Sequence, residues 1–285
     1  MEMVHFIPTS QRRLVLLAAQ TDTAPVLIFG TQGTGKSSIA KWIHYNGPRS
    51  VQPILTANQD SPLLEQLISA QKGTLVIPEI GEWPRGEQKR LLDFLNSKSI
   101  DHPQNPKMKM LLNVRIIATT SQALENRALG GLFNEELLNK LNVFRVVMPN
   151  LSLRDEEFED ITLGILRELT RELQKEHIQN ISDNAWTKLK NHNWPANLRE
   201  MRNVLRVSVM TTQEDIIEAE NLPNFEKDDI DFSATREQFE KNYIIGLLKA
   251  FDWEIDRTCE ISKMDKTILL QKMNQYGIKP DSNSI

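Results

Sequence analysis

Short apolar runs alternate with helical patterns over residues 1–150 of the chain. Each run is bounded by polar or turn-forming residues, and the runs that we expect to be strands are Val26–Phe29, Pro53–Ala57, Leu75–Ile77, Val114–Ala118 and Val143–Met148. Strands that alternate with helices are typical of an α/β fold in which helices cover a mostly parallel sheet. We therefore predict an α/β domain over residues 1–150.

The remainder of the chain divides into two helical parts and a linker. Over residues 151–213, leucines recur at the spacing of one helix face, as at Leu163, Leu166, Leu169 and Leu173. This part is predicted to be a small all-α domain. The acidic stretch 214–231, which contains Pro223, is the predicted linker to a third unit at 232–285.

The composition is that of a soluble globular chain, because 40% of the 285 residues are hydrophobic and 25% are charged. The start MEMVHFIPTS lacks the blocks of a signal peptide, and no apolar run approaches the roughly 20 residues of a membrane-spanning helix. We therefore expect a cytoplasmic protein without membrane contact. The one cysteine, Cys259, has no partner for an internal disulfide, and the five histidines lack ligand-like spacing, so no structural metal is expected.

The net charge bears on nucleic-acid binding. A formal charge of -4 argues against electrostatic attraction of the whole chain to nucleic acid. It does not exclude a local basic face that binds nucleic acid.

The most specific motif is GTQGTGKS at Gly30–Ser37, which follows a predicted strand and matches the phosphate-binding pattern G-x-x-x-x-G-K-S/T. In such a loop, backbone N–H groups converge on the phosphates, the lysine reaches the β- and γ-oxygens, and the next hydroxyl can ligate Mg²⁺. We predict that ATP or ADP binds here with Mg²⁺. The lysine is Lys36, the Mg²⁺-ligating hydroxyl is Ser37, and the other binding residues are Gly30, Thr31, Gln32, Gly33, Thr34, Gly35 and Ser38. A glycine turn that binds nothing is the alternative, but it would not need Lys36 and Ser37 together.

Several segments resemble, in the same order, those of the NtrC-type AAA+ activators of sigma-54 transcription. These segments are IPTSQRRL, TDTAPVLIFGTQGTGKSS, SIAKWIHYNGPR, KGTLVIPEIGEWP, NVRIIATT, LFNEELLNKLNVF and HNWPANLREMRNV. The resemblance covers nearly the whole chain and implies an α/β AAA+ core with a parallel P-loop sheet, an all-α lid and a C-terminal Fis-type helix-turn-helix. It also implies nucleotide held between the subunits of a ring. Because the core starts almost at residue 1, we expect no receiver domain before it.

The chain departs from the family where the family has an acidic pair, in a segment like GGTLFLDEIGEMP. The matching residues are Pro78 and Glu79. Glu79 stands where the family has its water-activating base, whereas Pro78 offers no carboxylate to orient a metal. The alternative for Glu79 is that it only caps or solvates the loop before Trp83.

A second departure concerns the arginine fingers, which in the family reach into the neighbouring subunit. The matching positions hold Asn134 and Lys140, and neither can make the bidentate fork of an arginine. Lys140 offers a point charge at best, and a solvated helix lysine is the alternative. Ser121 stands at the family's polar sensor position as a weaker substitute.

A third departure is a deletion between Asn58 and Gly73. The family carries a long insertion with GAFTGA there, the loop that contacts sigma-54, and this chain has only QDSPLLEQLISAQK. We therefore expect no contact with sigma-54.

The lid segment Trp194–Glu200 matches the family's WPGNVREL, which implies that Arg199 touches the nucleotide phosphates. The alternative is that Arg199 pairs with an acidic neighbour such as Glu200.

The segment Thr258–Ile278 resembles the Fis-type pattern AAELLGISRRTLYRKLKKYGI, which implies that a helix from about Asp265 to Tyr276 enters the major groove. Its DNA-binding candidates are Lys266, Thr267, Gln271, Lys272, Asn274 and Gln275. The expected small core contains Ile261, Met264, Leu269, Met273 and Tyr276, with Cys259 as a packed thiol. Because few basic residues remain, dimerisation or a protein contact is the alternative to DNA binding. A preceding helix, Ser233–Ala250, has an apolar stripe suited to pairing two copies: Phe239, Tyr243, Ile244, Leu247 and Leu248.

Two functions therefore compete. In the first, the protein is a DNA-binding transcription regulator and a homo-oligomer, dimer or ring, whose nucleotide switches conformation or assembly with little or no hydrolysis. In the second, it is an active AAA+ ATPase that remodels a target other than sigma-54. A protein-binding scaffold that binds neither ATP nor DNA is a third possibility.

Overall fold

The computed structural model describes residues 6–102, 105–225, 241, 244–245, 248, 253–262 and 265–278. The chain forms two compact units, Met1–Pro223 and Asn224–Ile285, which are described separately.

A five-stranded parallel sheet forms the centre of the first unit, in the order β2-β3-β6-β1-β7. Its strands are β1 (Val26–Gly30), β2 (Ile54–Thr56), β3 (Thr74–Ile77), β6 (Arg115–Thr120) and β7 (Phe144–Met148). The predicted α/β architecture with a parallel sheet is confirmed. In the register, Val26 of β1 lies between Ile117 of β6 and Phe144 of β7. The carboxyl ends of β1, β3 and β6 therefore meet at one edge, where polar side chains gather.

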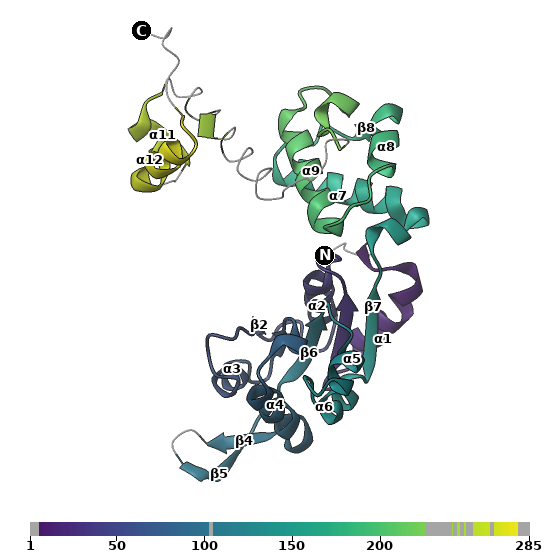
Figure 1. The fold of residues 1–285 in the computed structure, drawn as a ribbon, viewed down its shortest axis with the longest axis vertical. Coiled ribbons are helices and arrows are strands. Elements are labelled where there is room, and N and C mark those ends of the chain that lie inside the picture. Colours follow the sequence, from purple (N-terminus) through teal and green to yellow (C-terminus); the bar gives the residue numbers. More distant parts are fainter. Residues whose placement is uncertain are drawn as a thin grey trace. The chain divides into compact units, whose positions relative to one another are not determined.

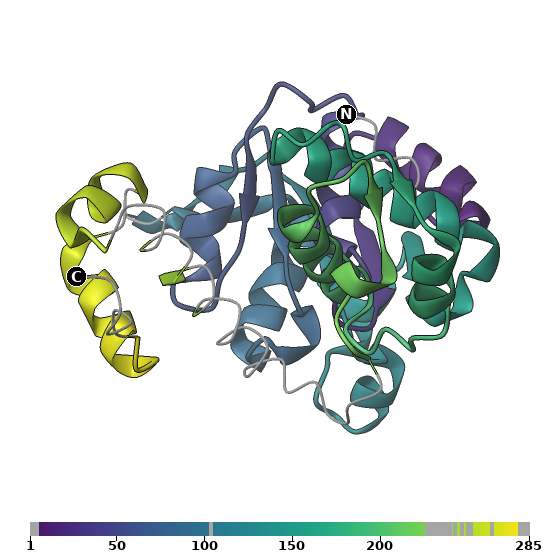
Figure 2. The same cartoon turned by 90° about the horizontal axis from the view of Figure 1, so that it is seen from above.

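Successive residues of the central strands enter two different hydrophobic cores, which explains why these strands are apolar without interruption. Val26 and Ile28 join the core under α1 and α2, whereas Leu27 joins the core on the opposite face. Figure 2 shows purple α1 and blue α3 and α4 on opposite sides of the sheet. The helices of this α/β part are α1 (Arg12–Gln20), α2 (Lys36–Tyr45), α3 (Leu63–Ser69), α4 (Arg85–Ser97), α5 (Leu124–Leu129) and α6 (Glu135–Leu141).

An antiparallel hairpin follows α4 and was not expected from the sequence. Its strands are β4 (Ser99–His102) and β5 (Asn105–Leu111), and Figure 1 shows it beyond α4. Short 3-10 helices occur at Thr9–Gln11 (η2), Ile80–Glu82 (η3), Leu151–Leu153 (η4), Asp155–Glu157 (η5) and Ala219–Asn221 (η6).

A helical lid completes the first unit, as the sequence pattern predicted. Its helices are α7 (Phe158–Glu172), α8 (Asp183–Lys190) and α9 (Asn197–Thr211), and the two-residue strands β8 (Asn180–Ile181) and β9 (Ile216–Ile217) pair in parallel beside them. The stretch predicted as a linker, 214–231, thus starts inside the lid with β9 and η6. Its part beyond Phe225 lies outside the described residues.

The second unit contains α11 (Ile255–Ser262) and α12 (Lys266–Gln275). Its small core consists of Ile244, Leu248, Leu269 and Ile278, with Cys259, Met273 and Tyr276 packed against it. Ile244 and Leu248 are fully buried here, so these two members of the stripe expected to pair two copies serve the unit's own core instead. Phe239, Tyr243, Leu247 and Met264, and the side chain of Ile261, lie outside the described residues.

Across the described part of both units, no helix is long and apolar enough to span a bilayer.

Candidate functional site

The phosphate-binding loop connects β1 to α2 at the carboxyl edge of the sheet. Two of its glycines are required by the backbone. Gly33 has a φ of +78°, and a Cβ atom there would lie 1.9 Å from the carbonyl oxygen of Ala196. Gly35, with a φ of +93°, is the N-cap residue immediately before α2. These glycines shape the loop and let the lid approach it closely.

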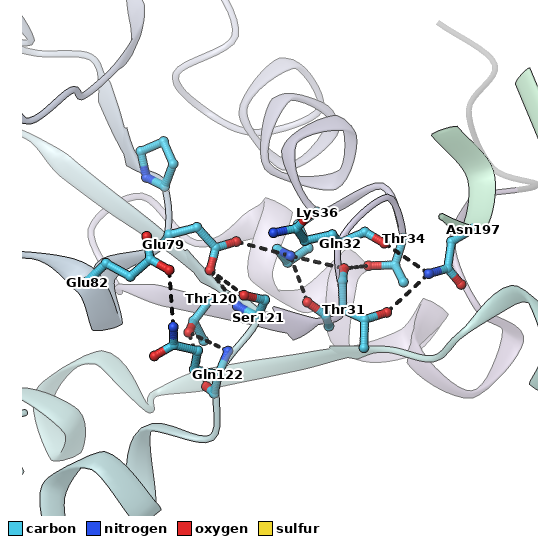
Figure 3. A network of polar contacts seen from close by, with 12 residues as sticks. Thr31, Gln32, Thr34, Lys36, Glu79, Glu82, Thr120, Ser121, Gln122 and Asn197 are labelled. Atoms are coloured by element: carbon cyan, nitrogen blue, oxygen red, sulfur yellow. Dashed lines mark hydrogen bonds and ion pairs between the residues drawn. The ribbon is translucent and has the colours of Figure 1, made fainter. Parts of the chain in front are cut away.

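Lys36 is buried at the first turn of α2, and its ammonium faces the loop. The Nζ atom donates hydrogen bonds to the carbonyl oxygens of Gly30, at 2.7 Å, and Thr31, at 3.1 Å. It also forms an ion pair with Oε1 of Glu79 at 3.2 Å. Figure 3 shows Lys36 between the loop and Glu79. The cation is therefore preplaced at the loop and offset by a carboxylate that a phosphate would replace.

Glu79 links the loop to the neighbouring strand end. It follows β3 with a φ of 43°, a left-handed conformation that a non-glycine residue adopts at a cost of about 1 kcal/mol or more. Its Oε2 atom accepts hydrogen bonds from the backbone N–H of Ser121, at 2.7 Å, and from the Ser121 hydroxyl, at 2.8 Å. The Glu79 side chain makes no cap of η3. The carboxylate is thus held between Lys36 and Ser121, and does not merely cap or solvate the following loop.

A magnesium ion would find few ligands from this chain. The Ser37 hydroxyl is exposed beside the phosphate loop and can supply one oxygen, with the nucleotide phosphates supplying others. Pro78 has no carboxylate, and its carbonyl oxygen accepts a hydrogen bond from Nε1 of Trp83 at 2.9 Å. Among the described residues no group of three or more His, Cys, Asp or Glu could hold a metal ion. The donors fit an ion carried in with the nucleotide better than a resident one.

The lid touches the phosphate loop through Asn197, a buried residue with a φ of 55°. Its Nδ2 atom donates to the Gln32 carbonyl oxygen, at 2.9 Å, and to Oγ1 of Thr31, at 3.2 Å. Its Oδ1 atom accepts from the N–H of Leu151, at 2.8 Å, just after β7. Asn197 therefore joins three segments: lid, loop and the connection between core and lid.

Asn150 completes this network, since the Thr31 hydroxyl donates to its Oδ1 atom at 2.6 Å. Sequence reasoning missed both asparagines as site residues. The only signal for Asn197 is its place two residues before Arg199 in WPANLRE.

The backbone of Arg199 contacts the phosphate-binding loop, and its side chain is exposed to solvent. Its backbone N–H donates to the Gly33 carbonyl oxygen at 3.3 Å. Its side chain is exposed, with no hydrogen bond or ion pair to any described residue. The expected alternative, a pair with Glu200, does not form, because that carboxylate accepts from Ala196 N–H, at 2.9 Å, and contacts Nε2 of His192, at 2.6 Å. The Arg199 guanidinium is therefore not bound to Glu200 and is open to a ligand.

Asn134, at the first arginine-finger position, is a structural helix cap. Its Oδ1 atom accepts from the N–H of Leu137 at 2.8 Å, and its own N–H donates to Oε1 of Gln88 at 2.9 Å. Lys140 lies exposed in the last turn of α6. The Oδ1 atom of Asn134 is thus engaged within its own subunit as a helix cap, and the side chain has no guanidinium.

The DNA-binding candidates lie together on α12 of the second unit. Thr267, Gln271, Asn274 and Gln275 are exposed, and Lys272 is half-buried. Lys266 forms an ion pair with Asp256 of α11 at 2.5 Å, which raises the pKa of Lys266 above its ordinary value. One of the two lysines of this helix is therefore offset by a carboxylate within the same unit.

A model of the sigma-54 interaction domain matches residues 9–151, and a model of the AAA+ ATPase lid domain matches residues 153–238. The chain belongs to the sigma-54 interaction domain family. The resemblance to NtrC-type activators is thereby confirmed. In this chain, β2 and β3 are joined by one short helix, α3, and its turns.

The relatives of this chain include a regulatory protein. The chain is 28% identical to the regulatory protein AtoC of Escherichia coli, over 90% of this chain and 63% of AtoC. It is also 28% identical to the nitrogen fixation protein AnfA of Azotobacter vinelandii, over 92% of this chain and 54% of AnfA. The chain therefore spans less than two thirds of the length of these curated relatives.

Solved structures agree with the family assignment. NtrX from Brucella abortus in complex with ATP matches with a TM-score of 0.64 and 26% identity, over 97% of this chain and 68% of that chain. The RuvB Holliday junction branch migration motor of Thermotoga maritima matches with a TM-score of 0.54 at 13% identity, over 98% of this chain and 91% of that one, which shows a shared fold alone.

Proposed function

We propose that the protein is a transcription regulator whose AAA+ module binds ATP or ADP as a switch of conformation or assembly, with weak or no hydrolysis. DNA binding by the second unit and independence from sigma-54 are parts of the same proposal. The observation that carries it is the contrast between two residues. The ammonium of Lys36 already lies at the phosphate-binding loop, whereas the Asn134 side chain caps a helix and is not an arginine.

Nucleotide binding is supported by the loop and the lid together. The glycine-shaped loop precedes α2, whose N-terminus favours an anion, and Lys36 supplies the cation. Arg199 of the lid is open to the same ligand. NtrX, the similar protein, has been solved in complex with ADP and with ATP.

Weak hydrolysis is supported by what surrounds the loop. Catalysis of phosphoryl transfer comes from charges placed around the γ-phosphate and its metal. Here Pro78 supplies no carboxylate, and no arginine stands at position 134. Loss of an arginine finger alone lowers the rate by about 10³- to 10⁵-fold.

A switch is supported by the contacts that a phosphate would change. An arriving phosphate would compete with Glu79 for Lys36, and it would recruit Arg199 beside the Asn197 contacts. A ligand shifts an equilibrium only by its different affinity for the two states. The lid and its surface for other subunits would then differ between the nucleotide-bound and free forms, so we expect a nucleotide-dependent homo-oligomer.

Independence from sigma-54 is supported by the short connection between β2 and β3. The region that carries the sigma-54 loop in the family is reduced here to α3 and its turns. The similarity to the regulatory protein AtoC supports a regulatory role.

An active ATPase that remodels another target is the second candidate. The observation in its favour is that Glu79, at the position of the family's base, lies beside Lys36 at the phosphate loop. Glu79 would then activate the attacking water.

Calorimetry on the full chain tests the nucleotide proposal. We expect ATP and ADP to bind with nanomolar to micromolar affinity, in the range of about -8 to -12 kcal/mol. Lys36→Ala should abolish this binding, and Lys41→Ala, an exposed lysine of the same helix, should preserve it. Equal binding by Lys36→Ala and the wild type, or no heat with the wild type, would overturn the proposal.

A further inference from the structure

The outward face of α12 presents polar but uncharged side chains. Leu269 is fully buried and Met273 packs on the same core, so the opposite side of the helix faces away from it. The side chains exposed on that opposite side are Thr267, Ile268, Gln271, Asn274 and Gln275.

These side chains form an ordered surface. Thr267, Gln271 and Gln275 are spaced four positions apart and so make a stripe along the helix. Ile268 is 47% exposed and lies three positions before Gln271, directly beside the stripe. Leu270 is 39% exposed, but at about 100° per residue it projects from the flank of the helix.

Charge is nearly absent from this surface. The helix sequence KTILLQKMNQ contains no acidic residue that would repel phosphate. Lys266 is paired with Asp256 at 2.5 Å, and Lys272 is half-buried. Any nucleic acid bound here would be held by base contacts more than by phosphate attraction.

The chemistry of the surface favours one kind of base pair. A glutamine amide can pair bidentately with N6 and N7 of adenine in the major groove, and an aliphatic side chain can contact the C5-methyl group of thymine. Guanine is read most often by arginine or lysine, which the stripe lacks. Resting on the proposed DNA-binding function, we propose that α12 reads A·T base pairs, with Gln271 and Gln275 on adenine edges and Ile268 against thymine methyl groups.

A protein partner fits this surface less well. A stable protein interface buries roughly 800 Å² on each side, with aromatic or apolar anchors at its centre. Here the centre of the face is polar, and the exposed aliphatic residues near the described stripe are Ile268 and, on the flank of the helix, Leu270. A single helix of this kind has the size that the major groove admits.

The test uses the full chain and duplex DNA. Rounds of selection from a library of random duplexes would give a preferred sequence, in which we expect A·T pairs at the contacted positions. Fluorescence anisotropy would then compare this duplex with the same duplex in which uracil replaces thymine. Because uracil lacks only the methyl group, we expect about fourfold weaker binding for each contacted methyl.

Two variants assign the effect to one side chain. Ile268→Ala should bind the thymine and uracil duplexes equally, whereas Leu270→Ala should keep the preference for thymine. Both sites are exposed, and circular dichroism would verify that both variants are folded.

The outcomes separate the two proposals. If the wild type binds no duplex at all, the proposed DNA-binding function fails, and the reading of A·T pairs fails with it. If it binds DNA but selects G·C pairs, or binds thymine and uracil duplexes equally, only the A·T inference is overturned. Retention of the thymine preference by Ile268→Ala would also overturn the A·T inference. A lower mass of this variant than of the wild type in sedimentation would overturn it as well, because Ile268 would then lie in a contact between copies.

Discussion

The ammonium of Lys36 lies 3.2 Å from the carboxylate of Glu79, although 43 positions of sequence separate the two residues (79 − 36). Glu79 is in turn held by both hydrogen-bond donors of Ser121. The cation proposed to bind phosphate and the candidate base thus form an ion pair at the edge of the sheet (Figure 3). Under the proposed function, a nucleotide phosphate would displace this contact, which would couple binding to a change in the site.

Replacing Glu79 by glutamine should strengthen nucleotide binding. The amide keeps the shape of the side chain but removes the charge that competes with phosphate for Lys36. Lys36 is buried, but the Glu79 side chain is 28% exposed and solvent screens the pair, so we expect about two- to fivefold tighter ATP binding in calorimetry. Glu82→Gln, in the same loop, is the control and should leave the affinity unchanged. Weaker binding by Glu79→Gln would mean that the carboxylate assists the nucleotide.

Removing the Asn197 side chain should loosen the contact between lid and loop. Asn197→Gly suits the left-handed backbone but loses the hydrogen bonds to Thr31, Gln32 and Leu151. We expect the free energy of unfolding in urea to fall by about 1 to 3 kcal/mol. Asn203→Ala, at an exposed position of α9, should change it by less than about 0.5 kcal/mol. An unchanged stability for Asn197→Gly would show that these bonds are replaced by water at no cost.

Substitutions of Asn134 test whether its side chain stabilises the protein as a helix cap. Asn134→Ala should lower the free energy of unfolding by about 1 kcal/mol, because the N–H of Leu137 loses its acceptor. Asn134→Asp keeps an acceptor and should retain the wild-type stability. Thermal unfolding monitored by circular dichroism distinguishes the two variants. If both melted at the wild-type temperature, the cap would not be the reason for asparagine here.

Stability should fall as the pH drops below about 6.5, because of His44. Burial lowers the pKa of this imidazole, nearby Arg115 and Arg49 lower it further, and the Gln52 carbonyl opposes the shift. Below the ordinary value of 6.5 the unfolded chain binds a proton that the folded chain refuses, so stability present above pH 6.5 is lost on acidification. Three carboxyl groups have pKa values below the ordinary value of 4.5, and they change the stability only below about pH 4.5: those of Glu125, Glu157 and Glu172.

Urea denaturation at several pH values between 7 and 5 measures the effect of His44. In His44→Gln the slope of stability against pH in this window should be smaller than in the wild type, whatever the absolute stability of the variant. An equal slope would assign the pH dependence to other groups.

Local patterns predicted the sheet, the lid helices and the phosphate loop, because each depends on neighbours in sequence. The runs around Val26 and Leu75 are buried on both faces, and an uninterrupted apolar run indicates such a strand. The hairpin β4–β5 escaped prediction because its first strand, SIDH, lacks an apolar alternation. Periodicity alone predicts no such strand.

The details of the site depended on contacts between distant residues. Nothing local indicates that Glu79 adopts a left-handed backbone or that Asn197 reaches Thr31. The stripe containing Ile244 and Leu248 was correctly predicted to be apolar. The prediction that it pairs two copies of the chain was wrong for these two residues. The second unit needs both of them for its own small core, which a sequence pattern does not distinguish from a surface for another copy.

The central claim is that the site binds a nucleotide triphosphate without the charges needed to hydrolyse it efficiently. Its most direct test is phosphate release measured on wild-type chain that calorimetry has shown to be saturated with ATP and Mg²⁺. We predict saturable binding together with a turnover far below the roughly 1 to 100 s⁻¹ of phosphoryl-transfer enzymes. A turnover within that range, lost in Glu79→Gln, would contradict the claim.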